Sequence, residues 1–211
     1  MRTIAKSIVI LAATAAACMA QQWEFGGTGG AGFLNNVSVT APIAAATAGF
    51  QTGASFGAYF GQNLYPHFSG EVHYGFLMSD LKLASGGNTV TFSGVSHVVH
   101  YDLVYHTNRP SRTQFFAAVG GGMKVFDGTG REQAYQPLSQ YGYFTKTQTF
   151  KPMGDFGAGI RYTLTPHLSL RIEFRDYITS FPTEVLTPAP GTKYGSLLHD
   201  LVPMVGIGYQ Y

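Results

Sequence analysis

The sequence has 211 residues, of which 45% are hydrophobic and only 11% are charged, against roughly 25% charged residues in ordinary soluble domains. If an export signal removes Arg2 and Lys6, the other Lys and Arg residues equal the 11 Asp and Glu residues, so the net charge is about zero and nothing favours a nucleic-acid partner. Cys18 is the only cysteine, which excludes an internal disulfide and a cysteine-based metal site.

The N-terminus has the pattern of an export signal. Two basic residues precede a short apolar run at residues 8–17, and small residues follow it. The run is too short to cross a bilayer as a helix, so we expect residues 1–20 to be removed as a signal peptide. Cleavage after Ala20 is expected, with Ala17 as the alternative. The residues around Cys18 also faintly resemble a lipoprotein cleavage box, which leaves lipidation as a second interpretation.

Residues 21–211 alternate between apolar and polar side chains with the period of two that is typical of β-strands. No stretch there approaches the 18 or more apolar residues of a membrane-spanning helix. The pattern predicts eight strands, which are Trp23–Phe33, Phe50–Gly61, Phe68–Met78, Thr91–Thr107, Thr113–Phe126, Phe150–Leu164, Leu168–Arg175 and Leu201–Tyr211. A single all-β domain is therefore expected.

The connections between these strands alternate in length. Short Pro-containing turns at 63–66, 108–110 and 165–167 alternate with long loops rich in Gly, Ser, Thr and Pro near 34–49, 79–90, 127–148 and 180–199. Short periplasmic turns and long extracellular loops are typical of outer-membrane barrels. We therefore expect the long loops at the cell surface, where they could contact an extracellular ligand through exposed residues such as Lys82, Arg131, Tyr135, Tyr141, Tyr143 and Lys193.

The turn at 165–167 constrains the faces of two strands, because residues paired across strands share a face. Pairing of Leu164 with Leu168 would place apolar residues opposite one another and Arg161 beside Arg171. Adjacent arginines repel, so carboxylates should lie close by. The candidates are Glu173 and Asp155 and, from across the barrel, Glu24 or Glu71.

The polar faces of the strands together predict a charge network inside the barrel. Its expected members are Glu24, Glu71, His100, Asp102, Lys124, Lys151, Asp155, Arg161, Arg171, Glu173 and Arg175. The interior of an eight-stranded barrel is just wide enough for side chains, and buried charges must be paired. We interpret the network as a plug that holds the barrel together. A small gated path for ions or solutes, in which the pairs rearrange, is the alternative.

Histidines on the inward faces raise the question of metal binding or catalysis. His100 and Asp102 lie two residues apart on one face, and His73 lies on the neighbouring strand. The spacing fixes no third ligand, so a His–carboxylate hydrogen bond is favoured and no metal or cofactor is expected. Ser96 and His100 could suggest a lipid-modifying enzyme, but outer-membrane deacylases have a His two residues before a Ser on a lipid-facing strand near the C-terminus. His167 and Ser169 have this spacing, but His167 falls in a proposed turn with no acidic neighbour in sequence, so no enzymatic activity is expected.

The last residues alternate in the same way, and Gly206, Tyr209 and Tyr211 resemble the C-terminal assembly signal of bacterial outer-membrane barrels, with Tyr where a terminal Phe is commoner. This resemblance implies recognition by the barrel assembly machinery.

With this architecture the chain after the signal resembles the small outer-membrane barrels of the OmpA/OmpX and opacity-like class. The resemblance implies an eight-stranded antiparallel up-and-down transmembrane β-barrel, residues 21–211, that lies in outer-membrane lipids without a periplasmic peptidoglycan-binding domain. Members of this class include structural proteins and adhesins, so a structural or adhesin-like surface role is expected. A soluble lipocalin-like ligand binder, with its apolar faces inward, is the alternative.

Overall fold

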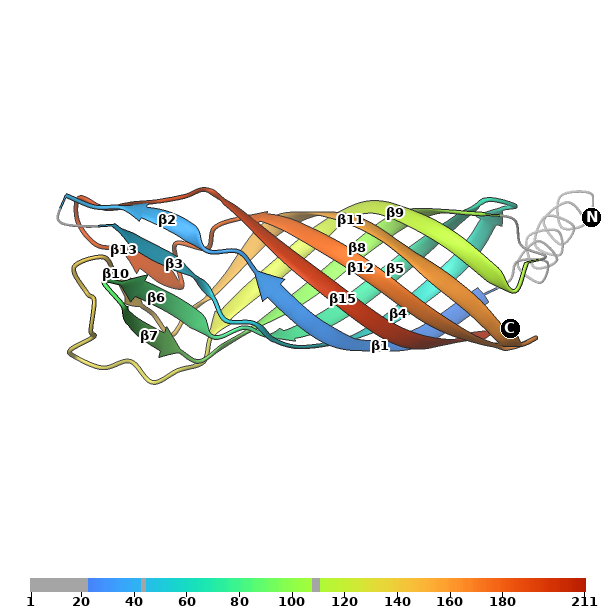
Figure 1. The fold of residues 1–211 in the computed structure, drawn as a ribbon, viewed down its shortest axis with the longest axis horizontal. Helices are drawn as coiled ribbons and strands as arrows, with labels where there is room; N and C mark the ends of the chain where they lie inside the picture. Colours follow the sequence, from blue (N-terminus) through green and yellow to red (C-terminus); the bar gives the residue numbers. More distant parts are fainter. Residues whose placement is uncertain (1–22, 43–44, 108–110) are drawn as a thin grey trace, which may run out of the picture.

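The computed structural model describes residues 23–42, 45–107 and 111–211. The expected signal peptide with Cys18 and the turn at 108–110 lie outside these ranges. Eight long strands form a closed barrel in the order β1-β15-β12-β11-β9-β8-β5-β4 (Figure 1). Their bounds are β1 Trp23–Leu34, β4 Gly53–Tyr65, β5 Phe68–Met78, β8 Gly94–His106, β9 Thr113–Gly128, β11 Gln148–Thr165, β12 Leu168–Ser180 and β15 Leu197–Gln210. Within the described ranges no helix is long and apolar enough to cross a membrane.

The eight predicted strands are the eight strands of the barrel, and each pairs antiparallel with both neighbours. Two predicted strands include residues that belong to separate, shorter strands. Phe50 ends a separate strand, β3 (Ala46–Phe50), and residues 91 and 92 end β7 (Asn88–Phe92). The alternation continues across both breaks, which is why the sequence pattern alone did not reveal them.

The register at the turn of residues 165–167 confirms the predicted faces. Arg161 pairs with Arg171, and the apolar pairs on either side are as expected. The predicted Leu164–Leu168 pair is wrong, because the register shifts after Thr163 and Thr165 then pairs with Leu168. The Thr165 hydroxyl accepts the Leu168 backbone N–H at 3.1 Å, which closes the turn one residue later than expected.

Apolar side chains cover the outer face of the barrel. The outward residues include Phe25, Phe56, Val72, Tyr101, Phe115, Phe156, Ile172 and Val205, each about half exposed. Most charged side chains of the same strands point inward and are buried. This polarity suits a barrel surrounded by lipid and is the reverse of that expected for a soluble lipocalin-like binder.

The long loops fold into a second β-structure, which we name the cap, at the end of the barrel away from the C-terminus (Figure 1). A five-stranded sheet has the order β14-β2-β3-β6-β7, and β10 pairs with β13. The remaining bounds are β2 Val37–Thr40, β6 Leu81–Ser85, β10 Gly142–Phe144, β13 Leu186–Pro188 and β14 Lys193–Tyr194. The cap is therefore an ordered extension of the barrel rather than a set of separate loops.

The cap has its own apolar core. Its buried members include Val39, Leu83, Phe92, Phe126, Phe144, Val185, Leu186 and Leu198. Tyr141, expected to be exposed, belongs to this core and is 4% exposed, whereas Tyr135 is 77% exposed. The backbone carbonyl of Tyr141 accepts hydrogen bonds from the hydroxyls of Thr192 and Tyr194, which ties two loops together.

Candidate functional site: the barrel lumen

The two adjacent arginines, in the half of the barrel away from the cap, meet carboxylates from the opposite wall. Arg171 Nη2 lies 2.8 Å from Glu71 Oε2, and Arg161 Nη2 lies 2.9 Å from Glu24 Oε2. Arg161 also lies 3.4 Å from Glu71, while Arg171 Nε donates to Glu173 at 2.9 Å. Glu24 and Glu71, which were predicted as partners from across the barrel, therefore neutralise the two arginines together with Glu173. Asp155, the other predicted partner, binds Arg175 instead.

Aromatic rings hold the Arg171 guanidinium in place. It lies 4.6 Å from the ring centre of Tyr59 and 4.3 Å from that of Phe116. The space for the second ring depends on Gly159, where a Cβ would lie 2.5 Å from the Phe116 ring. A fully buried cation is thus surrounded by carboxylates and aromatic faces, which are the two environments that compensate its lost hydration.

Arg175 is the centre of a second cluster nearer the middle of the barrel. Its Nη1 contacts Asp102 and lies 2.5 Å from Asp155 Oδ2, and its Nε donates to Glu173 at 3.2 Å. Because Glu173 binds both Arg171 and Arg175, it joins the two clusters into one network. The alkyl part of Arg175 fills the space left by Gly157, where a Cβ would lie 2.6 Å from Arg175 Cδ.

Two histidines complete the network. His100 Nδ1 lies 2.8 Å from Asp102, His73 Nε2 lies 2.9 Å from Glu71, and the two rings stack at 4.9 Å. His73, His100 and Asp102 could converge on one ion. Arg175 already contacts two of these three residues, His73 and Asp102, and its positive charge opposes a metal cation there.

An apolar layer lies above this network, toward the cap. It consists of Leu77, Val98, Met153, Tyr177, Val202 and Met204. Lys124 and Asp200 form a fully buried ion pair beyond it, and the Lys124 ammonium lies 4.7 Å from the ring centre of Phe126 in the cap core. From the charge network toward the cap, the interior thus changes from ionic to apolar, then to one ion pair, and then to the apolar cap core.

The predicted site residues separate into a lumen group and one exception. Glu24, Glu71, His100, Asp102, Lys124, Asp155, Arg161, Arg171, Glu173 and Arg175 are all buried in the interior. Lys151 differs, because it lies near the cap end of β11 and donates to Glu184 of the 180–199 loop at 2.7 Å. This hydrogen bond holds the pKa of Glu184 below its usual value.

The sequence pattern did not predict Tyr59 and Asp200 as members of the lumen network, and His73 was considered only as a neighbour of His100. The Tyr59 hydroxyl donates to Glu24 at 2.8 Å. Asp200 was assigned to a loop because the last strand was expected to start at residue 201, whereas β15 starts at Leu197. Continuing the inward parity from Val202 back to Asp200 would have found it.

The predicted C-terminal signal lies in the seam that closes the barrel. Tyr209 pairs with Phe25 at a ring distance of 5.4 Å, and the Tyr211 N–H donates to the Trp23 carbonyl at 2.9 Å. A Cβ at Gly206 would lie 2.6 Å from the Gly27 carbonyl oxygen. Close approach of β1 and β15 therefore requires glycine there.

Comparison with known proteins agrees with this architecture. Residues 7–197 match the family described as "Outer membrane protein beta-barrel domain", and the chain belongs to that family. It is an all-β, eight-stranded barrel of the outer membrane, in contact with the lipids of that membrane.

Solved structures support the same fold. OprG from Pseudomonas aeruginosa matches with a TM-score of 0.59 at 13% identity, over 89% of this chain and 95% of that one. Neisserial surface protein A matches with a TM-score of 0.55 at 8% identity, over 90% and 97%. A major outer membrane protein from Thermus thermophilus matches with a TM-score of 0.50 at 15% identity, over 90% and 99%. The search of curated proteins gave no match.

Proposed function

We propose that this protein is an outer-membrane barrel with a closed lumen, and that it acts at the cell surface through its cap in a structural or adhesin-like role. The observation that carries the proposal is the order of layers in the interior. Ion pairs fill the periplasmic half, and an apolar layer and the cap core lie above them.

A closed lumen follows from the energetics of these layers. An ion that crossed the apolar layer would lose its hydration without gaining polar partners, which is strongly unfavourable. A solute would also have to displace Arg171 and Arg175, each of which contacts at least two carboxylates. We infer that the charge network stabilises the barrel rather than lining a pore.

A surface role is supported by the shape of the cap. Short turns face the periplasm in barrels of this kind, so the cap lies on the outer side. Its strands form a scaffold with a packed core, and such scaffolds commonly present binding residues on their loops. Tyr135 and Tyr143, 77% and 42% exposed, are large side chains available to a partner.

A gated path for ions is the second candidate, and the continuous network from Glu24 to Asp155 favours it. Opening would require the apolar layer to move. We propose no enzymatic activity. Ser96 accepts a hydrogen bond from Ser79 and His100 binds Asp102, so the two are not arranged as a nucleophile and its base.

Attachment measurements test the proposed role. Vesicles that carry the protein should bind better than empty vesicles to at least one surface in a panel of immobilised matrix proteins and polysaccharides. Replacing the exposed tyrosines, Tyr135→Ser with Tyr143→Ser, should reduce that binding. Tyr65→Ser, at the last residue of β4 at the opposite end of the barrel and 70% exposed, is the matched control and should not. Equal attachment by protein-bearing and empty vesicles would contradict a surface-interaction role.

A further inference from the structure

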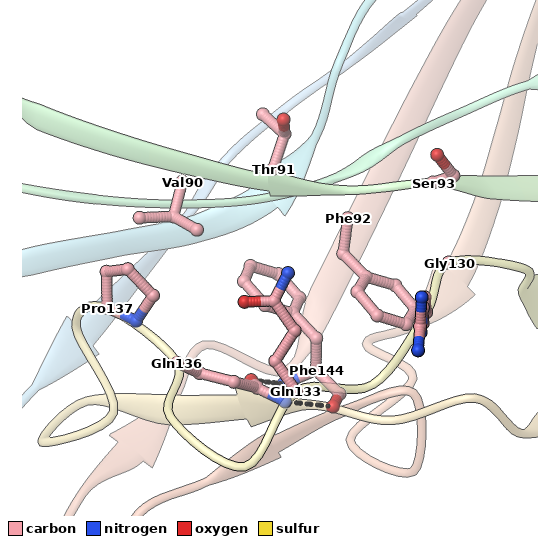
Figure 2. A pocket seen from close by; sticks show the side chains of 10 residues that line it. Val90, Thr91, Phe92, Ser93, Gly130, Gln133, Gln136, Pro137 and Phe144 are labelled. Atoms are coloured by element: carbon pink, nitrogen blue, oxygen red, sulfur yellow. Dashed lines mark hydrogen bonds between the residues drawn. The ribbon is translucent and has the colours of Figure 1, made fainter.

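A cavity of about 250 Å³ opens on the cap between β7 and the loop that follows β9 (Figure 2). Its lining comes from residues 90–93, from the segment 130–137 and from Phe144. The volume is below the range typical of drug-sized ligands, so the cavity suits a single small ring rather than an extended molecule.

The inner wall of the cavity is aromatic. Phe92 and Phe144 are buried, and their rings are parallel to within 3° at a centroid distance of 5.6 Å. Gln136 fixes this wall, because its amide accepts the Phe144 N–H at 2.8 Å and donates to the Phe144 carbonyl at 2.9 Å (Figure 2). Aromatic faces carry partial negative charge and favour the electropositive C–H groups of a sugar ring over other polar surfaces.

The outer rim of the cavity is polar and has free hydrogen-bonding capacity. Thr91, Ser93, Arg131 and Gln133 are exposed, and within the described part of the chain none of their side chains is engaged in a hydrogen bond or ion pair. Hydroxyl and amide groups can both donate and accept, which matches the hydroxyls of a sugar.

Among the described residues that line the cavity, Arg131 is the only charged one, and none of them is a carboxylate. A guanidinium at the mouth of a cavity binds carboxylates through two parallel hydrogen bonds. The charge balance thus favours an anionic ligand and disfavours a cationic one.

The backbone on one side of the cavity is fixed close to the aromatic wall. The N–H groups of Thr129 and Gly130 both donate to the Ser93 carbonyl, at 2.9 and 3.0 Å. A Cβ at Gly130 would lie 2.8 Å from the Phe92 ring. Glycine at this position therefore allows the Phe92 ring to form the wall of the cavity.

We propose that this cavity binds an acidic monosaccharide, with the sugar ring against Phe92 and Phe144 and its carboxylate on Arg131. The proposal rests on the surface-interaction role proposed above and names the chemical class of its ligand.

The test uses the full-length protein in lipid nanodiscs, titrated with methyl β-glucuronide, methyl β-glucoside and acetate. We expect the glucuronide to bind, the glucoside to bind about tenfold more weakly because the Arg131–carboxylate contact is lost, and acetate not to bind measurably. R131Q should reduce glucuronide affinity to the level of the glucoside. K193Q removes an exposed cation of the cap that does not line the cavity, and it should leave affinity unchanged.

A second pair of variants tests the aromatic wall. G130A should weaken both glycosides, because its methyl group displaces Phe92, whereas G154A, where a Cβ would meet no atom within 4 Å, should weaken neither. Absence of glucuronide binding to the wild type would overturn the proposal, and so would an R131Q variant that binds the glucuronide as tightly as the wild type does. If acetate binds as tightly as the glucuronide, the cavity is a simple anion site and the proposal of a sugar ligand is wrong.

The same variants in the attachment assay separate this inference from the proposed function. Attachment without glucuronide binding contradicts the cavity and leaves the surface role standing. Glucuronide binding without attachment supports the cavity and contradicts the surface role.

Discussion

The barrel lumen and the cap bury opposite kinds of side chains. The lumen buries arginines, carboxylates and histidines and exposes apolar side chains to lipid, whereas the cap buries Leu, Val and Phe as a protein in water does. Both regions are built from alternating strands of one chain. The difference teaches that the medium outside each region, lipid or water, decides which face of a strand becomes its interior.

Removing one carboxylate from the lumen should have the largest effect. Glu71 is 1% exposed and contacts Arg171, Arg161 and His73. Glu71→Gln should lower the free energy of unfolding by about 3–5 kcal/mol, because buried cations lose their partner. Denaturant unfolding of the barrel in lipid vesicles measures it.

Glu173→Gln should act in the same direction, since Glu173 bridges Arg171 and Arg175. The control is Asp176→Asn, on the outer face in a partly exposed pair with His199, where the effect should be below about 1 kcal/mol. Equal, small losses for all three variants would mean that water screens the lumen charges.

The buried Lys124–Asp200 ion pair, between the apolar layer of the lumen and the cap core, tests whether a charge pair is needed at this boundary. Lys124→Met alone leaves Asp200 unpaired among apolar residues and should destabilise the barrel by about 3–5 kcal/mol. The double variant Lys124→Met with Asp200→Leu should recover most of that loss, since a buried ion pair can be replaced by apolar residues at little cost. A double variant as unstable as Lys124→Met would contradict this reading.

The cap should respond as an ordinary apolar core. Leu83 is fully buried, and Leu83→Ala should cost about 2–5 kcal/mol through lost transfer energy and a cavity. The loss should appear as faster proteolysis of the cap while the barrel stays folded. If unfolding of the barrel in vesicles shifts by the same amount, the two regions form one cooperative unit instead.

The smallest effect should come from the ion pair at the junction of the two regions. The hydrogen bond from Lys151 keeps the pKa of Glu184 below 4.5 in the folded state. Its contribution is therefore fully present above pH 4.5 and is lost as the pH falls through the lowered pKa. Because Glu184 is half exposed, Glu184→Gln should change stability by no more than a few tenths of a kcal/mol, and the difference from wild type should vanish in acid. An effect that grows as the pH falls would contradict this.

Sequence alternation predicted the barrel strands and the Arg161–Arg171 register well, because both depend only on local parity. The partners of these arginines were harder to predict. Parity gives the face of Glu71 and Asp155 but not their depth, which depends on the stagger of all the strands around the barrel. That stagger brings Glu71 to Arg171 and Asp155 to Arg175.

The cap was missed for a different reason. Gly-, Ser- and Thr-rich segments were assigned to loops, although Gly86 and Gly87 between β6 and β7 form the turn of a hairpin, with φ of 57° and 82°. Two adjacent glycines between two segments of alternating apolar and polar residues are a recognised hairpin signal and could have revealed this unit. Its packing against the other three loops could not be read from local patterns.

Ion and solute flux through the reconstituted barrel tests the closed lumen most directly. With the apolar layer between the charge network and the cap core, the wild type should give no stepwise conductance in planar bilayers and no swelling of liposomes in a disaccharide. Reproducible conductance steps or rapid sugar uptake by the wild type would contradict the account.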